Sequence, residues 1–555
     1  MKYTFRRNFA AYFWAVLGTA LLFSCGAEQK QLAKHVIIIG VDGMSPDGIR
    51  NAETPNMDQM VVMGSSSMVA RGVLPTVSSP NWASLIMGAS PAQHGVTSND
   101  WRKDKNNIPT QVSGTTAFFP TIFKVAKDQQ PDLKTAIIYD WGGFGNLFDH
   151  SNPTHQEHAE GEENTTERVV EYFTKEKPNF LFVHLDHVDH AGHSEGHGTP
   201  AYYESVEKAD QLIGKIMTAV ASSDVSDETV IIVTSDHGGV GMGHGGESLA
   251  EIEIPWIAYG KNIKQGKALR SAINTYDTPA TAAYLLGLEI PQPWIGKPVL
   301  EAIEGEDVTL KYFTPERLQQ PQITPKVDVY SDGGGLFVGE SASLQIKNPN
   351  STGIVRYTLD GTMPTSSAAE YQGALEITEH TIVKAAMFKD GARVSQVESG
   401  FFRFIPSEKG HGLKYAVYEV DEMKRLPIFS DFVPVAKGVA LEPTLDRIAL
   451  TRESQVAITF EGYIHIERAG YYSFFTKSDD GSKLFIDGQE VVNNDGDHGI
   501  TEKSGSLSLS KGFHKIKVEY FNGGGGSWLG TYYQGPGIQK QPIPGSSLLS
   551  VNSQW

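Results

Sequence analysis

The feature that most constrains the fold is the alternation of short apolar runs with helical segments between His35 and about Val299. Five runs are β-branched and apolar on both faces, as buried parallel strands are: HVIIIGVDG, TAIIYDW, NFLFVHLDH, TVIIVTSDHGG and IPWIAYG. Residues 201–220 repeat apolar side chains at helical spacing, and residues 277–288 predict a capped helix. This alternation predicts an α/β domain with a doubly wound, mostly parallel sheet.

The composition and hydrophobic pattern of the sequence change after about Gly305. A Pro- and Gln-rich stretch, TPERLQQPQITPK, leads into short alternating strands separated by Gly, Pro and Asp turns. A chain of 555 residues is too long for a single core. We therefore predict an α/β domain at 25–304, a linker at 305–327 and two all-β sandwich modules at 328–405 and 412–555.

The first 24 residues have the pattern of an export signal. Three basic residues (Lys2, Arg6, Arg7) precede the apolar run FAAYFWAVLGTALLF, which is short for a membrane span. The single cysteine, Cys25, follows directly, and the junction resembles a bacterial lipobox. We expect cleavage before Cys25, lipid attachment there, and an exported lipoprotein held at the membrane of the cell envelope. The alternatives are an uncleaved anchor or a buried free thiol.

The formal net charge is −18. So acidic a chain argues against nucleic acid as a partner, because no broad basic face can form. The charge does not argue against small anionic substrates held by metal ions.

Carboxylates and imidazoles recur where three predicted strands end. Asp42 ends the first run, Asp189 and His193 follow the third at i, i+4 spacing, and Asp236-His237 end the fourth; His244 follows in a glycine-rich loop. In doubly wound sheets the carboxyl ends of strands share the edge where ligands bind. Mixed His/Asp sets suit zinc, and two metals about 3.5–4 Å apart can clamp an in-line phosphoryl displacement.

Residues 35–300 resemble the alkaline phosphatase superfamily, most closely its type I phosphodiesterase/nucleotide pyrophosphatase family. The matching motifs, in order, are VDG, TPNMDQM, PTVSSPN, MGASPAQHGVTSN, DHAGH, SDHGG and DTPATAAYLLGLEIPQPWIGKPV. The resemblance implies a two-metal phosphoester hydrolase with two zinc or other divalent ions. It assigns one metal to Asp189, His193 and His244, and the other to Asp42, Asp236 and His237.

The resemblance also implies a nucleophile in the stretch GVLPTVSSPNWASLIMG. Ser78, two residues before the Pro-Asn pair, matches the nucleophile, which also ligates the second metal and forms a phospho-enzyme. Asn99 matches the residue that donates to a phosphoryl oxygen. Ser78 lies near the start of a predicted helix, whose dipole suits an oxyanion. Thr76 and Ser79 are interpreted as capping or turn residues.

Some assignments have rivals in the sequence. Asp186 also precedes a histidine, but only Asp189 completes Asp-x-x-Gly-His. His244 departs from the nucleotide-cleaving branch, where the corresponding histidine lies far downstream; here the next one is His380, outside the predicted domain. His94, His184 and His187 are interpreted as structural or supporting residues.

Two departures concern the substrate. The family often has Phe after the nucleophile and Tyr five positions before the metal Asp, and these rings sandwich a nucleobase. Here those positions hold Ser79 and His184. We therefore expect a phosphodiester, or a phosphorylated glycan or lipid headgroup, as substrate.

Two other function classes compete with this prediction. SSPNW superficially resembles the sulfatase Cys/Ser-x-Pro-Ser-Arg signature, but Asn81 and Trp82 replace its Ser-Arg. The chain could instead be a glycan-binding surface lipoprotein with a residual hydrolase domain.

Both β modules have recognisable motifs. YTLDGTMPTSSAAEYQGALEITEHTIVKAAMFKDG resembles the chitobiase and hexosaminidase C-terminal module, usually a spacer. SDDGSKLFIDGQEVVNN resembles the protective-antigen-type β-sandwich. In lectin members, paired acids in that loop bind calcium and sugar, which makes Asp479 and Asp480 candidates for a calcium and glycan site.

Overall fold

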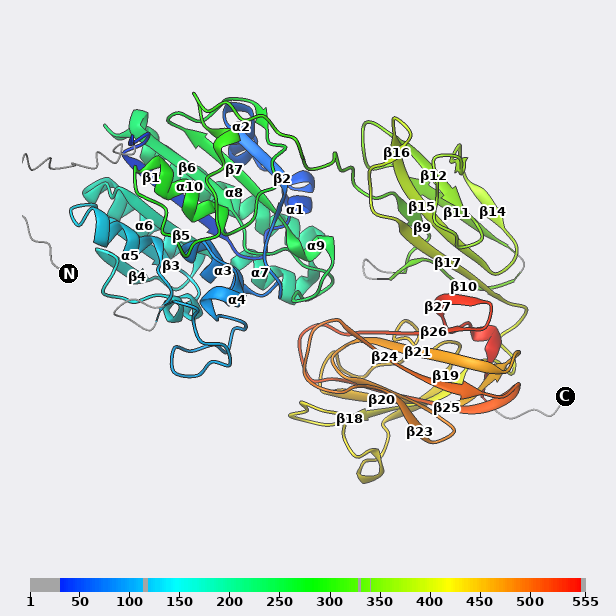
Figure 1. The fold of residues 1–555 in the computed structure, drawn as a ribbon. Coiled ribbons are helices and arrows are strands. Elements are labelled where there is room, and N and C mark those ends of the chain that lie inside the picture. Colours follow the sequence, from blue (N-terminus) through cyan, green and yellow to red (C-terminus); the bar gives the residue numbers. More distant parts are fainter. Residues whose placement is uncertain (1–29, 113–117, 328–330, 340, 551–555) are drawn as a thin grey trace, which may run out of the picture.

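The computed structural model describes residues 30–112, 118–327, 331–339 and 341–550, and Figure 1 shows their arrangement. The predicted signal peptide and Cys25 lie outside the described residues. Among the helices in those ranges, none is both long and apolar enough to cross a membrane.

The α/β domain is built on one eight-stranded sheet. Its strands follow the order β4 (His155–His158), β3 (Thr135–Tyr139), β5 (Phe180–Leu185), β1 (His35–Val41), β6 (Thr229–Thr234), β7 (Glu253–Gly260), β2 (Ser65–Arg71) and β8 (Lys267–Ala268). The first five are mutually parallel, which confirms the predicted fold class.

Strand β7 runs antiparallel to both β6 and β2. A parallel crossover needs a dozen or more residues, usually folded as a helix that packs on the sheet. The connection from β6 to β7 holds only the four-residue helix α9 (Leu249–Ile252). It folds instead as a loop over the carboxyl edge of the sheet, and the sequence motifs of that loop belong to the site.

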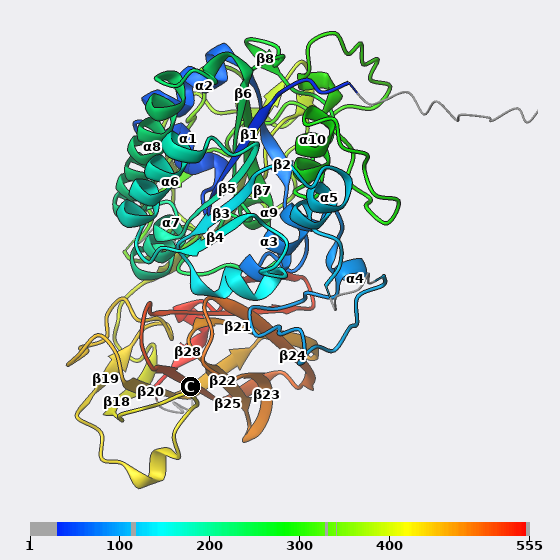
Figure 2. The ribbon, with the colours of Figure 1, turned by 90° about the vertical axis from the view of Figure 1, so that its left-hand side faces the viewer.

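Helices cover both faces of the sheet. The alternation of strand side chains shows this in β1: Val36 and Ile38 join one apolar core, and Ile37 and Ile39 join the other. Figure 2 shows the two helical layers on either side of the sheet. One layer contains α1 (Pro46–Asn51), α2 (Pro55–Met63), α6 (Glu162–Glu176), α7 (His187–Ala191) and α8 (Pro200–Ala221), and the other α3 (Ser78–Met87), α4 (Pro91–His94), α5 (Ile122–Gln129) and α10 (Asp277–Leu285).

The first β module packs two sheets around a core that includes Ile323, Leu344 and Phe402. One sheet contains β10 (Gly333–Val338), β17 (Glu398–Ile405), β15 (Thr381–Lys389), β12 (Ile354–Thr358) and β13 (Ala369–Glu370), with β16 (Ala392–Arg393) beside β15; the other contains β14 (Leu375–Ile377), β11 (Ala342–Lys347) and β9 (Gln322–Thr324). β9 thus contributes to the module from within the stretch expected to be a linker.

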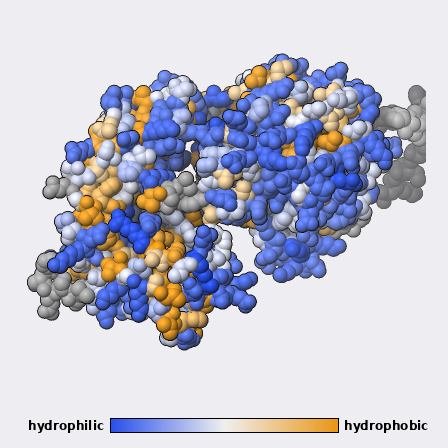
Figure 3. All heavy atoms as spheres, turned by 180° about the vertical axis from the view of Figure 1, so that it is seen from behind, coloured by the Kyte–Doolittle hydropathy of each residue, from blue (hydrophilic) through white to orange (hydrophobic). Residues whose placement is uncertain are grey.

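The last module, which we call the C-terminal sandwich (residues 412–550), also has two sheets. One contains β19 (Ala436–Ala440), β18 (Leu413–Glu419), β20 (Val456–Ile466), β25 (Gly512–Asn522), β22 (Ser482–Ile486) and β23 (Gln489–Asn494), with β28 (Leu548–Leu549) beside β20; the other contains β24 (Thr501–Leu509), β21 (Gly470–Asp479), β26 (Trp528–Gly535) and β27 (Ile538–Pro542). Seen from behind, the two β modules expose more apolar residues than the largely hydrophilic α/β domain (Figure 3).

Candidate metal centre

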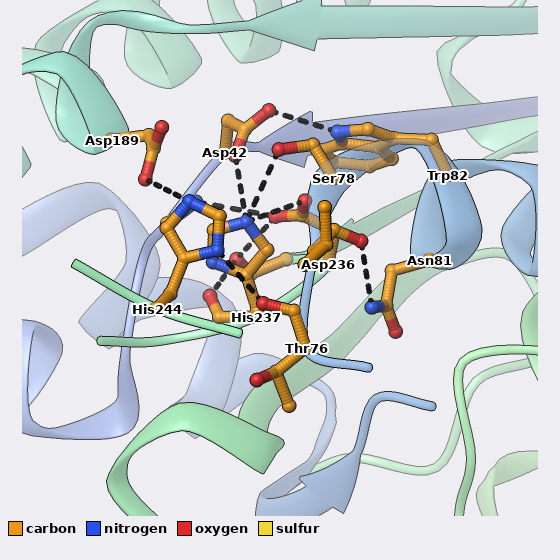
Figure 4. Close-up of polar contacts among 12 residues, drawn as sticks. Asp42, Thr76, Ser78, Asn81, Trp82, Asp189, Asp236, His237 and His244 are labelled. Atoms are coloured by element: carbon orange, nitrogen blue, oxygen red, sulfur yellow. Dashed lines mark hydrogen bonds and ion pairs between the residues drawn. The ribbon is translucent and has the colours of Figure 1, made fainter. Parts of the chain in front are cut away.

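The carboxyl edge of the sheet brings the predicted ligands together, as Figure 4 shows for most of them. Asp42 follows β1, Asp236 and His237 follow β6, and Asp189 lies in α7. His193 follows α7 by two residues, and His244 lies in the loop before α9. Of these six side chains only that of His193 is substantially exposed, at 48%. The site is therefore a buried cluster of polar groups, of which His193 is the exposed member.

Asp189, His193 and His244 form one group of potential ligands. The Nε2 atom of His193 lies 3.3 Å from Oδ2 of Asp189 and 3.1 Å from Nε2 of His244. Nε2 of His244 lies 3.7 Å from Oδ1 of Asp189. Ligand atoms bound tetrahedrally to zinc at about 2.05 Å lie about 3.3 Å apart, so these separations fit a zinc coordination shell.

A second group surrounds Nε2 of His237. Oδ1 of Asp42 lies 3.4 Å from that atom and Oδ2 of Asp236 lies 3.2 Å from it. The hydroxyl oxygen of Ser78 lies 3.3 Å from the same nitrogen. Three oxygen atoms thus lie within 3.4 Å of this nitrogen. Asp189 links the two sites, because Asp42, Asp189 and His237 form the second candidate metal group, which does not include Asp236.

The hydrogen bonds of the three imidazoles show which nitrogen faces the site. Nδ1 of His193, His237 and His244 lies 2.9, 2.9 and 2.8 Å from the backbone oxygens of Met242, Gly238 and Thr76, respectively. A carbonyl can only accept, so each Nδ1 donates its proton and each neutral ring presents an Nε2 lone pair to the site. The facing Nε2 atoms of His193 and His244 repel each other unless a proton or a cation lies between them.

The carboxylates are held in the same way, from behind. Oδ2 of Asp42 accepts from Nε1 of Trp82 at 2.9 Å and pairs with Nε2 of His184 at 3.2 Å. Oδ1 of Asp236 accepts from the Gly43 amide at 3.2 Å. The other oxygens, Oδ1 of Asp42 and Oδ2 of Asp236, are buried without a hydrogen-bond partner among the described residues. Buried carboxylate oxygens need a partner, and a divalent cation supplies one.

The electrostatics of the pocket agree with cation binding. Burial, together with Asp42 and Asp189, raises the pKa of Asp236 well above its usual range. Burial alone would raise the pKa of Asp189, but the hydrogen bond from His193 and the neighbouring imidazoles bring it below the ordinary value. The same hydrogen bond raises the pKa of His193 to about 9. A bound cation would stabilise all these carboxylates in their ionised form and replace a proton on His193.

Ser78 is the first residue of α3 and is buried. Its neighbour in sequence, Ser79, donates its backbone N–H to Oδ1 of Asn99 at 2.8 Å. That bond holds the Asn99 amide beside Ser78 and leaves its NH₂ group as a donor for another acceptor. The structure therefore brings Ser78 and Asn99 to the same end of α3, where the helix dipole is positive.

Thr76, interpreted from the sequence as a capping or turn residue, does not cap α3. The N-cap of α3 is Val77, without a side-chain cap. The Thr76 hydroxyl instead donates to Gly246 O at 2.8 Å and accepts from the Gly245 amide at 3.0 Å, so it fixes the loop that carries His244. The Ser79 side chain is buried at the start of α3.

Asn81 is a positioning residue that the sequence argument missed. Its Nδ2 donates to the backbone oxygens of Val73, Pro75 and Val77, and its Oδ1 accepts from the Val73 amide. These bonds shape the chain just before Ser78. The Pro-Asn pair of the motif was the available signal, although nothing in the sequence shows which atoms it binds.

The remaining histidines support the site or lie outside it. His184 is fully buried and pairs with Asp42, and His94 bonds the Ser84 hydroxyl at 3.0 Å. Asp186 groups with Asp42 and His184, and burial followed by Asp42 raises its pKa to about 7. Because His184 turns Nε2 to Asp42 and Nδ1 to the Trp141 amide, this third group offers a poorer set of lone pairs than the other two.

In the C-terminal sandwich, both carboxylate oxygens of Asp480 accept backbone N–H groups, from His498 at 3.0 Å and Gly523 at 2.8 Å. Asp479 is buried next to it. None of the candidate metal groups among the described residues contains either aspartate.

The chain matches three known protein families. Residues 36–253 match the family model for type I phosphodiesterase/nucleotide pyrophosphatase. That match spans the α/β domain from β1 to the start of β7 and includes all six candidate ligands. Residues 333–399 match the chitobiase/beta-hexosaminidase C-terminal domain, and residues 448–547 match the PA14 domain. All three resemblances inferred from the sequence are confirmed.

Individual curated relatives of the chain are distant in sequence. Rattus norvegicus ectonucleotide pyrophosphatase/phosphodiesterase family member 7 is 23% identical over 263 residues, which is 43% of this chain and 60% of the relative. Homo sapiens GPI ethanolamine phosphate transferase 2, catalytic subunit, is 23% identical over 49% of this chain and 28% of its own length. The chain thus matches less than two thirds of the length of these curated relatives.

Among solved structures, murine ectonucleotide pyrophosphatase/phosphodiesterase 5 aligns with a TM-score of 0.41 and 16% identity, covering 46% of this chain and 96% of its own.

Proposed function

We propose that this protein is a divalent-metal-dependent phosphoester hydrolase that cleaves phosphodiesters through Ser78. One observation carries the proposal: three imidazoles with Nδ1 committed to backbone carbonyls aim their Nε2 lone pairs at unpartnered oxygens of Asp42, Asp189 and Asp236, beside the Ser78 hydroxyl. Asp189, His193 and His244 would hold one metal, and Asp42, Asp236, His237 and Ser78 the other, with zinc as the expected ion.

The residues have the following roles in this proposal. When bound, the two metals supply Lewis acidity that lowers the pKa of a hydroxyl and neutralises phosphoryl charge. Ser78 gives its hydroxyl proton to solvent water and its oxygen forms a bond to phosphorus, while the bond from phosphorus to the leaving oxygen breaks and that oxygen takes up a proton from solvent. The NH₂ group of Asn99 donates a hydrogen bond to a non-bridging phosphoryl oxygen. Water then cleaves the phosphoseryl ester and regenerates Ser78.

The substrate is proposed to be a phosphodiester with a glycan or lipid headgroup as the leaving group. Curated relatives are named for nucleotide pyrophosphatase and for GPI ethanolamine phosphate transfer. The positions that would carry base-stacking rings hold Ser79 and His184, which are 2% and 0% exposed, so neither can stack on a substrate. This supports a substrate without a nucleobase.

The decisive experiment compares Ser78→Ala with Ser79→Ala as the matched control. Hydrolysis of bis-p-nitrophenyl phosphate and of the monoester is measured, with and without a chelator. We expect Ser78→Ala to lose at least about 10³-fold in kcat, Ser79→Ala to keep activity, and the chelator to abolish it. Ser78→Ala hydrolysing at the wild-type rate would refute Ser78 as the nucleophile.

The two other function classes, sulfatase and glycan-binding lipoprotein, predict different results for the same purified protein. A sulfatase would carry an aldehyde at position 78, which mass spectrometry of the Ser78 peptide detects. A glycan-binding lipoprotein with a residual hydrolase domain would bind glycans and hydrolyse neither ester.

Two further parts of the proposal concern the rest of the chain. Export and lipid attachment at Cys25 would place the enzyme at the cell envelope, which membrane fractionation with and without a Cys25→Ser change tests. Calcium or glycan binding by Asp479 and Asp480 is tested by calcium titration and a glycan array, and two blank results would remove it.

A further inference from the structure

The C-terminal sandwich meets the α/β domain at the loop that carries His244. Figure 2 shows the sandwich beneath the end of the α/β domain where α3, α4 and α7 lie. Two sandwich loops, 496–499 and 523–526, make the approach. They face residues 241–244, which we call the metal loop.

Two contacts define the junction. A Cβ atom added to Gly526 would lie 1.7 Å from Sδ of Met242, so the methionine side chain packs directly on this glycine. A Cβ atom added to Gly243 would lie 3.5 Å from the Cα atom of Gly499, so the two backbones are in close approach. Gly526 and Gly243 are both buried in the assembled chain. Any side chain at position 526 would have to displace the thioether end of Met242 from this contact.

Met242 connects this junction to the metal centre. Its backbone oxygen accepts from Nδ1 of His193 at 2.9 Å, the bond that turns Nε2 of His193 toward Asp189 and His244. Met242 also immediately precedes Gly243 and His244 in the metal loop. The same residue therefore holds a candidate ligand through its backbone and contacts the C-terminal sandwich through its side chain.

We infer that the C-terminal sandwich is a positioning element of the metal centre: its docking on Met242 and Gly243 fixes the loop that orients His193 and His244. Met242 is the positioning residue in the α/β domain, and Gly526 is the residue of the C-terminal sandwich on which its side chain packs. The inference rests on the proposed metal centre and adds to it that metal affinity depends on a separate domain, whose contacting residue Gly526 lies 284 residues after Met242 in the sequence. Misplacement of one imidazole ligand or its support typically weakens metal binding by about 10–100-fold.

The test uses two glycines of the same loop in the full chain. Gly526→Ala places a methyl group against Met242, whereas a Cβ atom at Gly524 meets nothing within 4 Å. Zinc retention is measured by competition with a chromogenic chelator, and hydrolysis separately. We expect Gly526→Ala to retain zinc at least about tenfold more weakly and Gly524→Ala to match the wild type. Met242→Ala combined with Gly526→Ala removes the clash and should recover part of the loss.

Unchanged zinc retention in a folded Gly526→Ala chain would overturn the inference, as would equal losses of zinc retention in Gly526→Ala and Gly524→Ala. In either case wild-type hydrolysis would leave the proposed function standing, whereas a wild-type chain that neither binds zinc nor hydrolyses esters would remove both.

Discussion

The imidazoles of the metal centre are oriented by backbone carbonyl groups, and the carboxylates by side chains and amides behind them. Trp82 is one of these supports: it is fully buried, and its Nε1 donates to the oxygen of Asp42 that faces away from His237. Such supporting bonds fix both the rotation of a ligand and the oxygen it presents.

Trp82→Phe should therefore weaken metal retention by about 10–100-fold, because Asp42 loses the donor that holds its Oδ2. Trp256→Phe is the matched control. Trp256 is equally buried but donates to the Thr278 hydroxyl, away from the ligands. Both variants lose an indole hydrogen bond in a core, so thermal melting should change alike. Equal zinc retention in the two would contradict the role given to Trp82.

The sequence was sufficient to find the six candidate ligands because each follows a recognisable strand or lies in a short motif. It was not sufficient for Trp82, Thr76 or Met242, since their contacts join segments 40 to 170 residues apart. A tryptophan on an apolar helix predicts core packing, and only the fold shows that its N–H meets Asp42. The same holds for His184, whose buried bond to Asp42 no spacing indicates.

At the scale of elements, the five apolar runs were predicted as strands because burial on both faces leaves a continuous apolar signature. β2 lacks that signature, since its sequence SSSMVAR is largely polar, and it was missed. The direction of β7 was also not predictable, because antiparallel and parallel buried strands have similar composition. β9 has only three residues, and its pairing with β11 decides its structure.

Strand β17 contains a carboxylate whose ionisation should oppose folding. Burial raises the pKa of Glu398 from 4.5 to about 7, with Asp332 adding to the rise and Lys326 opposing it. The folded chain thus binds this proton more tightly than the unfolded chain. Its stability is greatest below the unfolded pKa of 4.5 and falls as the pH rises through 7, by up to about 3 kcal/mol.

Glu398→Gln should remove that loss, since its amide carries no charge to desolvate. We expect the variant to melt at a higher temperature than the wild type at pH 8 and at a similar temperature at pH 5. Glu376→Gln, at an exposed position on β14 of the same module, is the control and should show no such pH dependence. A wild-type advantage at pH 8 would contradict the argument.

At the scale of the whole molecule, the two β modules are joined by a buried ion pair. Nε of Arg403 in β17 lies 2.7 Å from Oε1 of Glu442, and its NH2 atom lies 2.8 Å from Oε2. Tyr532 adds a hydrogen bond across the junction to Asp332 at 3.1 Å. These residues line a cavity of about 110 Å³ between the modules. The first β module therefore helps to hold the C-terminal sandwich in place.

Arg403→Met should destabilise the β modules by about 3–5 kcal/mol, because the Glu442 carboxylate stays buried without its partner. Replacing both residues by Met should recover much of that loss. Arg447→Met is the control: its pair with Glu408 is exposed, and its loss should cost no more than about 1 kcal/mol. Chemical denaturation measures all three. Equal effects of Arg403→Met and Arg447→Met would show that the buried pair contributes no more than the exposed one.

The packing of Met242 on Gly526 limits which C-terminal modules can be combined with this α/β domain, in evolution or by design. A spacer or adhesion module can be transplanted if its ends fit. A sandwich that contacts the metal loop must also present a residue without a side chain at one position, and the recipient must offer an apolar side chain of matching length opposite it. Chimeras that keep both Met242 and Gly526 should therefore retain the metal centre, whereas chimeras that exchange only one of the two residues should not.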